Sequence, residues 1–164
     1  MRRYAPWILL AAIITTSSCL KTGSEAGCTY DPCQYKVPDS QSVKIENYLS
    51  ANGLTAVKHC SGMYYTIITE GTGVAPTPCA KIAINYTGTL TNGNVFDKST
   101  SPIVFGLSGL IDGWKNGLPL VKRGGKIKLY IPPSLGYGQN PAGNNGSIPG
   151  NSILIFDIDL IDFQ

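Results

Sequence analysis

The side chains that most often carry enzyme chemistry are sparse in this sequence of 164 residues. His59 is the only histidine, and no Gly-x-Ser-x-Gly segment presents a serine nucleophile at a strand-to-helix turn. No nucleophile–base pair can therefore be assigned, so covalent and general acid–base catalysis have little support. Two kinds of chemistry remain, the reactions of cysteine thiols and binding in an apolar pocket.

The first cysteine, Cys19, stands where a bacterial lipoprotein is lipidated. It follows three small polar residues that resemble a lipobox, and the apolar run Ala5–Ile14 before them is too short for a permanent transmembrane helix. With two arginines near its start, the segment 1–18 is predicted to be a lipoprotein signal peptide. Acyl chains on Cys19 would then anchor the exported protein in the bacterial envelope, at the outer membrane. Ordinary signal cleavage nearby is the alternative.

Four further cysteines, Cys28, Cys33, Cys60 and Cys79, are disulfide candidates because export takes them into an oxidising compartment. Four cysteines allow three pairings. The short loop between Cys28 and Cys33 makes that pair easy to close, which leaves Cys60 with Cys79. A metal site that combines these thiols with His59 is the rival interpretation. The Cys-x4-Cys spacing suits structural zinc poorly, so no metal site is predicted.

Charge gives no support for nucleic-acid binding. Taking the two arginines of the signal segment from the 13 basic residues leaves 11 against 10 acidic ones, a formal charge of +1. No basic patch remains to follow a phosphate backbone, so no nucleic-acid partner is expected. Removing 18 of the 164 residues leaves 146, enough for one domain and a tail.

Polarity divides the mature chain into three parts. Residues 19–39 are polar and carry several glycines and prolines, which predicts a flexible tether. Residues 40–61 are predicted to form a helix, Ser40–Ala51, and an extended segment. The apolar stripe of that helix needs a partner, and packing on the domain is favoured over dimerisation. Residues 62–164 form the main domain.

Alternation of apolar and polar side chains predicts antiparallel strands with one face on a core. The clearest strands are Lys81–Thr87, Lys126–Ile131 and Ile153–Ile161, and residues 55–68 are predicted to form a β-hairpin or two extended segments. Gly113–Leu118 is the one good helix candidate inside the domain. The sequence therefore predicts an α+β fold, a curved antiparallel β-sheet wrapped around one short helix, preceded by the signal, the tether and the N-terminal helix.

Short motifs rich in aromatic residues, glycine and proline follow one another along the domain. In chain order these motifs are Tyr86-Thr87-Gly88, Gly93-Asn94-Val95-Phe96-Asp97, Ile111-Asp112-Gly113-Trp114, Gly124-Gly125-Lys126, Ile131-Pro132-Pro133-Ser134-Leu135-Gly136-Tyr137-Gly138, Ile148-Pro149 and Leu154-Ile155-Phe156-Asp157. Together they resemble the FKBP-type peptidyl-prolyl cis/trans isomerases, and the export signal indicates their exported bacterial lipoprotein type. The resemblance covers about Gly62 to Phe163 and agrees with the predicted fold.

The resemblance implies an apolar substrate cavity with Trp114 as its floor. It implies three catalytic residues: Asp97, with its carboxylate near the twisting amide, Tyr137, whose phenol hydrogen-bonds a carbonyl, and Phe96, which shapes the wall. The remaining substrate-binding residues that it implies are Tyr86, Phe105, Leu110, Ile111, Ile148 and Phe156, with the Ile111 N–H as a second donor and Ile148 at the lip.

The implied activity is rotation of X-Pro bonds with no cofactor and no covalent intermediate. The barrier to rotation is the lost amide resonance, and an apolar cavity that removes water and favours the twisted amide lowers it. The implied partners are proline-containing unfolded or partly folded proteins, with macrolides as possible inhibitors. The implied role is to assist protein folding in the cell envelope. The alternative is a non-catalytic chaperone or adaptor that binds proline-containing segments.

Overall fold

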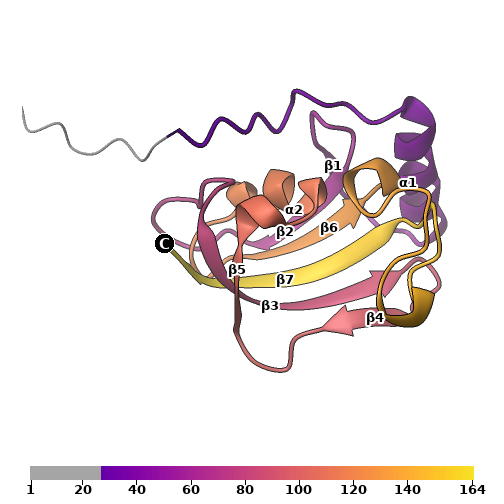
Figure 1. The fold of residues 1–164 in the computed structure, drawn as a ribbon. Coiled ribbons are helices and arrows are strands. Elements are labelled where there is room, and N and C mark those ends of the chain that lie inside the picture. The colour runs from indigo at the N-terminus through magenta and orange to yellow at the C-terminus, as the bar shows by residue number, and fades with distance from the viewer. Residues whose placement is uncertain (1–26) are drawn as a thin grey trace, which may run out of the picture.

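The computed structural model describes residues 27–164, so the predicted signal peptide and Cys19 lie outside the described residues. One seven-stranded antiparallel sheet runs in the order β1–β2–β6–β7–β3–β4, with β5 paired to β3 (Figure 1). The strands are β1 (Val57–Lys58), β2 (Tyr64–Thr69), β3 (Lys81–Leu90), β4 (Val95–Lys98), β5 (Ile103–Gly106), β6 (Lys126–Ile131) and β7 (Leu154–Phe163).

The main core lies between the sheet and one short helix, α2 (Asp112–Gly117). The predicted alternation is confirmed in β7, where Leu154, Phe156, Ile158 and Leu160 are all at most 3% exposed. Lysines and aspartates occupy the opposite face and form ion pairs, as between Lys128 and Asp157. The predicted α+β fold is therefore confirmed, including the hairpin of β1 and β2.

Two glycines allow α2 to lie directly on β6. A Cβ atom at Gly113 would come within 2.5–2.7 Å of the Ile131 side chain, and one at Gly117 within 2.6 Å of Leu129. Real Cβ contacts are essentially never that short, so a larger residue would push the helix off the sheet. Because α2 has only six residues, this packing rather than its own hydrogen bonding keeps it helical.

The N-terminal helix α1 (Asp39–Ala51) packs on part of the sheet face opposite to α2. Its Ile45 and Leu49 are 0% and 5% exposed and pack with Tyr64, Tyr130 and Ile155, which alternate with the main-core residues along their strands. The predicted packing of this helix on the domain is thus confirmed. The dimerisation alternative is wrong for this stripe, because the stripe is already buried within the chain. No helix within residues 27–164 is both long and apolar enough to cross a membrane.

The structure differs from the predicted flexible tether over residues 27–38, here called the strap. The strap runs along the surface of the domain before α1 begins (Figure 1). Its Val37 is 6% exposed in the main core and donates its N–H to the Ser61 carbonyl at 2.9 Å. Tyr30 donates its hydroxyl to Asn116 Oδ1 at 2.7 Å. A few specific contacts order this polar segment, which its low apolar content alone did not indicate.

The favoured cysteine pairing is also corrected. The disulfides join Cys28 to Cys79 and Cys33 to Cys60, with Cα–Cα distances of 5.7 and 5.4 Å. Closing the short Cys28–Cys33 loop is easy in an isolated chain, but the strap runs along the domain and brings each cysteine to a different loop. The two disulfides therefore fasten the strap at two places.

Candidate active site, an aromatic cavity

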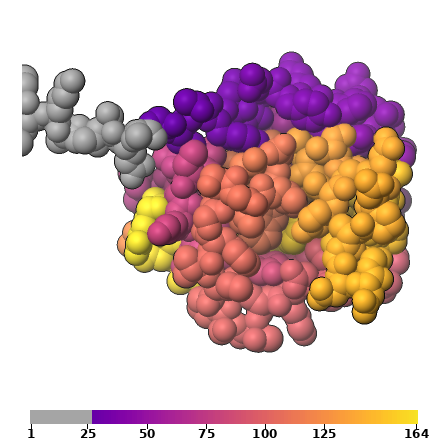
Figure 2. Space-filling view, viewed as in Figure 1, coloured from indigo at the N-terminus to yellow at the C-terminus, as the bar shows by residue number. Residues whose placement is uncertain are grey.

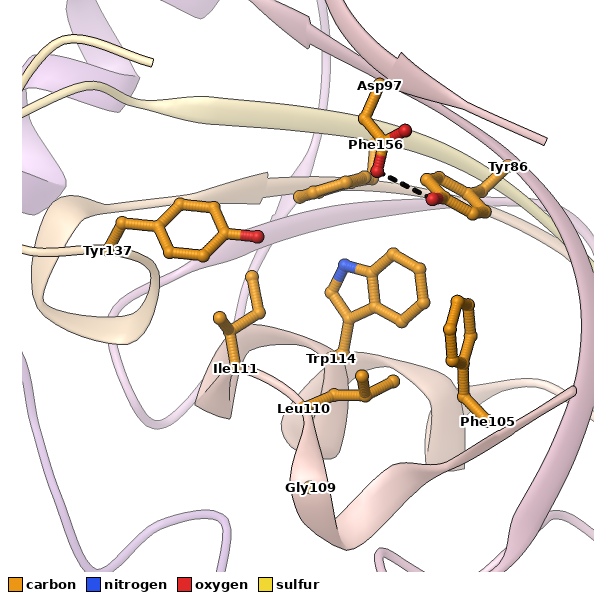
Figure 3. Close-up of a pocket in the computed structure, with 9 residues that line it drawn as sticks. All are labelled: Tyr86, Asp97, Phe105, Gly109, Leu110, Ile111, Trp114, Tyr137 and Phe156. Atoms are coloured by element: carbon orange, nitrogen blue, oxygen red, sulfur yellow. Dashed lines mark hydrogen bonds between the residues drawn. The ribbon is translucent and has the colours of Figure 1, made fainter. Parts of the chain in front are cut away.

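A cavity of about 250 Å³ opens on the face of the sheet that carries α2. Figure 2 shows it as a recess between the segment that contains α2 and the segment that follows β6, with strand β7 visible at its base. Its lining combines aromatic, aliphatic and few polar groups, and the close-up in Figure 3 shows them converging: Tyr86, Asp97, Phe105, Gly109, Leu110, Ile111, Trp114, Tyr137 and Phe156. Eight of these nine were predicted as site residues, and Gly109 was not.

Trp114 lies at the base of the cavity, as predicted for its floor. The indole is 4% exposed and meets Phe156, Tyr86 and Phe105 edge-on, with ring centroids 5.1, 5.3 and 6.4 Å away. Edge-to-face contacts suit the charge distribution of aromatic rings and hold all four side chains in fixed positions. The floor is therefore a rigid apolar surface wide enough for a small ring.

Phe96 supports the wall from behind rather than lining it. Its ring packs edge-to-face on Phe156 at 5.4 Å and 89°. A Cβ at Gly88 would lie 2.6 Å from the Phe96 ring and 2.9 Å from the Phe156 ring, so the glycine two residues after Tyr86 makes room for both. The conformational role of Phe96 is thus to orient Phe156.

Asp97 is held in place by the hydroxyl of Tyr86. The Tyr86 hydroxyl donates to Asp97 Oδ2 at 2.7 Å across the pair β3 and β4 (Figure 3). Partial burial, followed by the bond to Asp97 and its negative charge, raises the pKa of Tyr86 to about 12. Tyr86 therefore keeps its proton and remains a donor throughout the neutral range, which fixes one carboxylate oxygen at the upper wall.

Tyr137 points its hydroxyl into the cavity from the opposite side (Figure 3), and the residue is 45% exposed. Desolvation and then the negative charge of Asp97 raise its pKa above the usual value for tyrosine. The turn that carries it is anchored by Leu135, 2% exposed, and by the Gly138 N–H bonded to the Pro133 carbonyl at 2.9 Å. Gly138 has φ +73°, a left-handed conformation that favours glycine.

The rim beside Tyr137 is formed by the residues that lead into α2. Leu110 and Ile111 are half-buried, and the Ile111 carbonyl accepts the Trp114 N–H at 3.0 Å. The Ile111 N–H takes no part in backbone hydrogen bonds among residues 27–164, so it is free to donate to a ligand. Gly109, in the 3-10 turn Leu107–Gly109, exposes backbone to the cavity, and only its place beside Leu110 could have indicated this role.

Ile148, expected at the lip, does not line the cavity. It is 3% exposed and belongs to the main core, where its N–H and carbonyl bond the backbone of Ala142 at 2.9 Å. The loop 138–150 therefore folds back on itself through this bridge, and Ile148 anchors the loop rather than presenting a contact surface.

His59 lies away from the cavity, beside the Cys33–Cys60 disulfide. One of its ring nitrogens and the two sulfur atoms lie within 4.8 Å of one another, and burial lowers the pKa of the imidazole. Both sulfurs are bonded to each other, so the disulfide form offers a metal no thiolate and only one imidazole.

The geometry favours binding over bond-making chemistry. Besides the Ile111 N–H at the rim, the lining residues contribute the Asp97 carboxylate, the hydroxyls of Tyr86 and Tyr137, and the indole N–H of Trp114, which has no hydrogen-bond partner among the described residues. Two donors on one side and a fixed carboxylate on the other can orient a polar planar group above an apolar floor. Such a site can accept a ring and strip water from an adjacent amide.

Comparison with known proteins gives one consistent family. Residues 73–161 match the family of FKBP-type peptidyl-prolyl cis-trans isomerases. The chain is 47% identical over 107 residues to the FKBP-type peptidyl-prolyl cis-trans isomerase FkpA of Escherichia coli K12. That alignment covers 63% of this chain and 38% of the relative, so the chain spans well under half of the relative's length.

Solved structures agree. The crystal structure of FkpA from Escherichia coli superposes with a TM-score of 0.66 at 39% identity, covering 77% of this chain and 60% of that one. A peptidyl-prolyl cis-trans isomerase from Pseudomonas syringae pv. tomato superposes with a TM-score of 0.66 at 30% identity, covering 79% of this chain and 98% of that one.

Proposed function

The chain belongs to the family of FKBP-type peptidyl-prolyl cis-trans isomerases, and from this membership we propose that it catalyses rotation about X-Pro bonds in polypeptides. The observation that carries the proposal is the intact cavity. Trp114, Tyr86, Asp97 and Tyr137 all face one apolar space of about 250 Å³.

The proline ring enters over the Trp114 indole, between the rings of Tyr86 and Phe156. The X-Pro carbonyl then loses its water and accepts hydrogen bonds from Tyr137 or the Ile111 N–H. Because water stabilises the planar, polar amide, its removal costs more for the ground state than for the twisted amide. A barrier of about 18–20 kcal/mol falls without any covalent bond being made or broken.

A non-catalytic segment-binding chaperone is the second candidate, favoured by the half-exposed Tyr137 at an open rim. A chaperone needs only affinity for the proline segment, whereas an isomerase must also favour the twisted amide over the planar one. The Tyr86–Asp97 hydrogen bond of 2.7 Å holds a carboxylate at the cavity wall, where it can act on the twisting amide, and this favours the enzyme.

The test is refolding of a protein whose slow step is prolyl isomerisation. Catalytic amounts of the mature chain should accelerate that phase, and the Phe96→Ala/Asp97→Val variant should lose most of the acceleration while staying folded. Val95→Ala, an exposed neighbour on β4, is the matched control and should keep it. Acceleration only at stoichiometric amounts would favour the chaperone. Full activity in the folded double variant would show that this cavity is not the catalyst.

We further propose that the protein assists folding in the cell envelope, anchored through lipidated Cys19, and that macrolides compete for the same cavity. Export is consistent with the two disulfides, since these persist in oxidising compartments. Cys19→Ala should move the protein from the membrane fraction to the soluble one. Unchanged membrane retention would contradict the anchor.

A further inference from the structure

A second hollow, of about 170 Å³, lies beside the cavity, between the strap and the start of α2. The two share their boundary: Ile111 lines the cavity and the next residue, Asp112, lines the hollow. On the other side, Leu135 lines the hollow and Tyr137 the cavity. Figure 2 shows the strap crossing the same face as the recess, so a polypeptide that leaves the cavity can continue toward the strap.

The strap side of the hollow is a fixed wall. The two disulfides fasten the strap at Cys28 and Cys33, and the Tyr30 hydroxyl bonds Asn116, which is 2% exposed, in α2. Lys115 lies 4.9 Å from the centre of the Tyr30 ring. A wall held this way does not need to be ordered on binding, which lowers the entropic cost of a contact there.

The lining of the hollow is negative and aromatic. Asp31 and Asp112 contribute carboxylates, and Lys115, paired with Asp112 at 2.6 Å, balances only one of them. Tyr35, a residue that is 52% exposed, adds an aromatic ring, and no lysine or arginine among residues 27–164 lines the hollow. The pKa of Tyr30 is raised to about 12, first by burial and then by these two carboxylates, which agrees with a negative local field.

We propose that this hollow is a second subsite, which takes a lysine or arginine side chain of the client polypeptide near the proline held in the cavity. The ammonium or guanidinium group contacts Asp31, and its alkyl stem lies on Tyr35, where a cation is also attracted by the ring face. The inference rests on the proposed isomerase function and adds a sequence preference to it.

Peptides with one common X-Pro core test the preference. A lysine, glutamate or alanine is placed roughly two to five residues before or after the proline, a span of about 7–18 Å in an extended chain. At one of these positions the lysine peptide should be turned over roughly three- to tenfold more efficiently than the glutamate peptide at low salt, and the ratio should shrink at high salt.

Two variants locate the effect. Asp31→Asn keeps an oxygen for the Cys33 N–H that Asp31 Oδ1 now accepts at 2.8 Å, so the strap turn is retained while the charge is lost. It should abolish most of the lysine preference and leave the alanine peptide unchanged. Asp159→Asn removes an exposed carboxylate on the outer sheet face and should leave the preference intact.

Equal kcat/KM for lysine and glutamate peptides at every position would overturn the subsite, even with normal turnover of the alanine peptide. If no peptide is turned over, the isomerase function itself has failed. Fluorescence anisotropy of the labelled peptides then still reads the hollow, because lysine peptides should bind more tightly than glutamate peptides. Equal binding, or an equal loss in Asp31→Asn and Asp159→Asn, would overturn the proposal.

Discussion

Replacement of Tyr86 by phenylalanine isolates the hydrogen bond that fixes Asp97. The variant keeps the ring that packs on Trp114 at 5.3 Å and on Phe105 and Phe156 at 6.3 Å. What it removes is one O–H···O bond of 2.7 Å to an exposed carboxylate. Such a bond contributes about 0.5–1.5 kcal/mol net, so kcat/KM for a proline peptide should fall roughly two- to twelvefold.

A double-mutant cycle shows whether the loss acts through Asp97. Asp97→Asn alone should lower kcat/KM by a similar factor. The combination with Tyr86→Phe should cost little more than either change, because both remove the same positioned charge. Tyr86→Ala is the contrast, since it also removes three aromatic contacts and should lower the free energy of unfolding by about 3 kcal/mol. Fully additive effects of Tyr86→Phe and Asp97→Asn would refute the reasoning.

Three further expectations follow from the same geometry. Tyr137→Phe removes one donor, so kcat/KM should fall by about tenfold or less, and a larger fall would indicate a role beyond one hydrogen bond. The pKa values of Tyr86 and Tyr137 are both raised, so kcat/KM should vary by less than about twofold between pH 6 and 8, and a bell-shaped rate profile in this range would contradict the expectation. The stability contributed by protonated Tyr86 should be constant below pH 10 and be lost as the pH rises toward 12. Replacing Cys28 and Cys79 by serine opens a separation of 51 residues and should lower the free energy of unfolding by about 4 kcal/mol in denaturant titrations, whereas an unchanged midpoint would show that the strap adds no stability.

The sheet and most of the cavity could be predicted because their signals are local and repeat along the chain. In β6 and β7 every second side chain is apolar, which fixes the buried face whatever the neighbouring strand. The family motifs could be recognised because close packing requires their glycines. Gly88 makes room for the rings of Phe96 and Phe156, and Gly113 makes room for Ile131. Positions with so little steric freedom leave a recognisable sequence.

The strap and Ile148 could not be predicted, because their placement depends on contacts between distant segments. Residues 27–38 bury one aliphatic side chain, Val37, so their composition resembles that of a linker. The pairing of Cys28 with Cys79 and of Cys33 with Cys60 follows from the path of the strap over the domain. The family resemblance implied a position at the lip for Ile148, but the backbone bridge to Ala142 turns it inward.

The position of α2 connects the strap to the cavity. The inner side of this six-residue helix is set by Gly113 and Gly117 against β6, and its outer side by Asn116, which accepts the Tyr30 hydroxyl. Trp114 lies in the same turn of helix as these residues, so the contacts with β6 and with Tyr30 both affect the position of the cavity floor. A helix too short to persist alone takes its conformation from what surrounds it. A disulfide-fastened segment outside the family's matched region, residues 73–161, thus helps to hold the floor on which the proline is expected to rest.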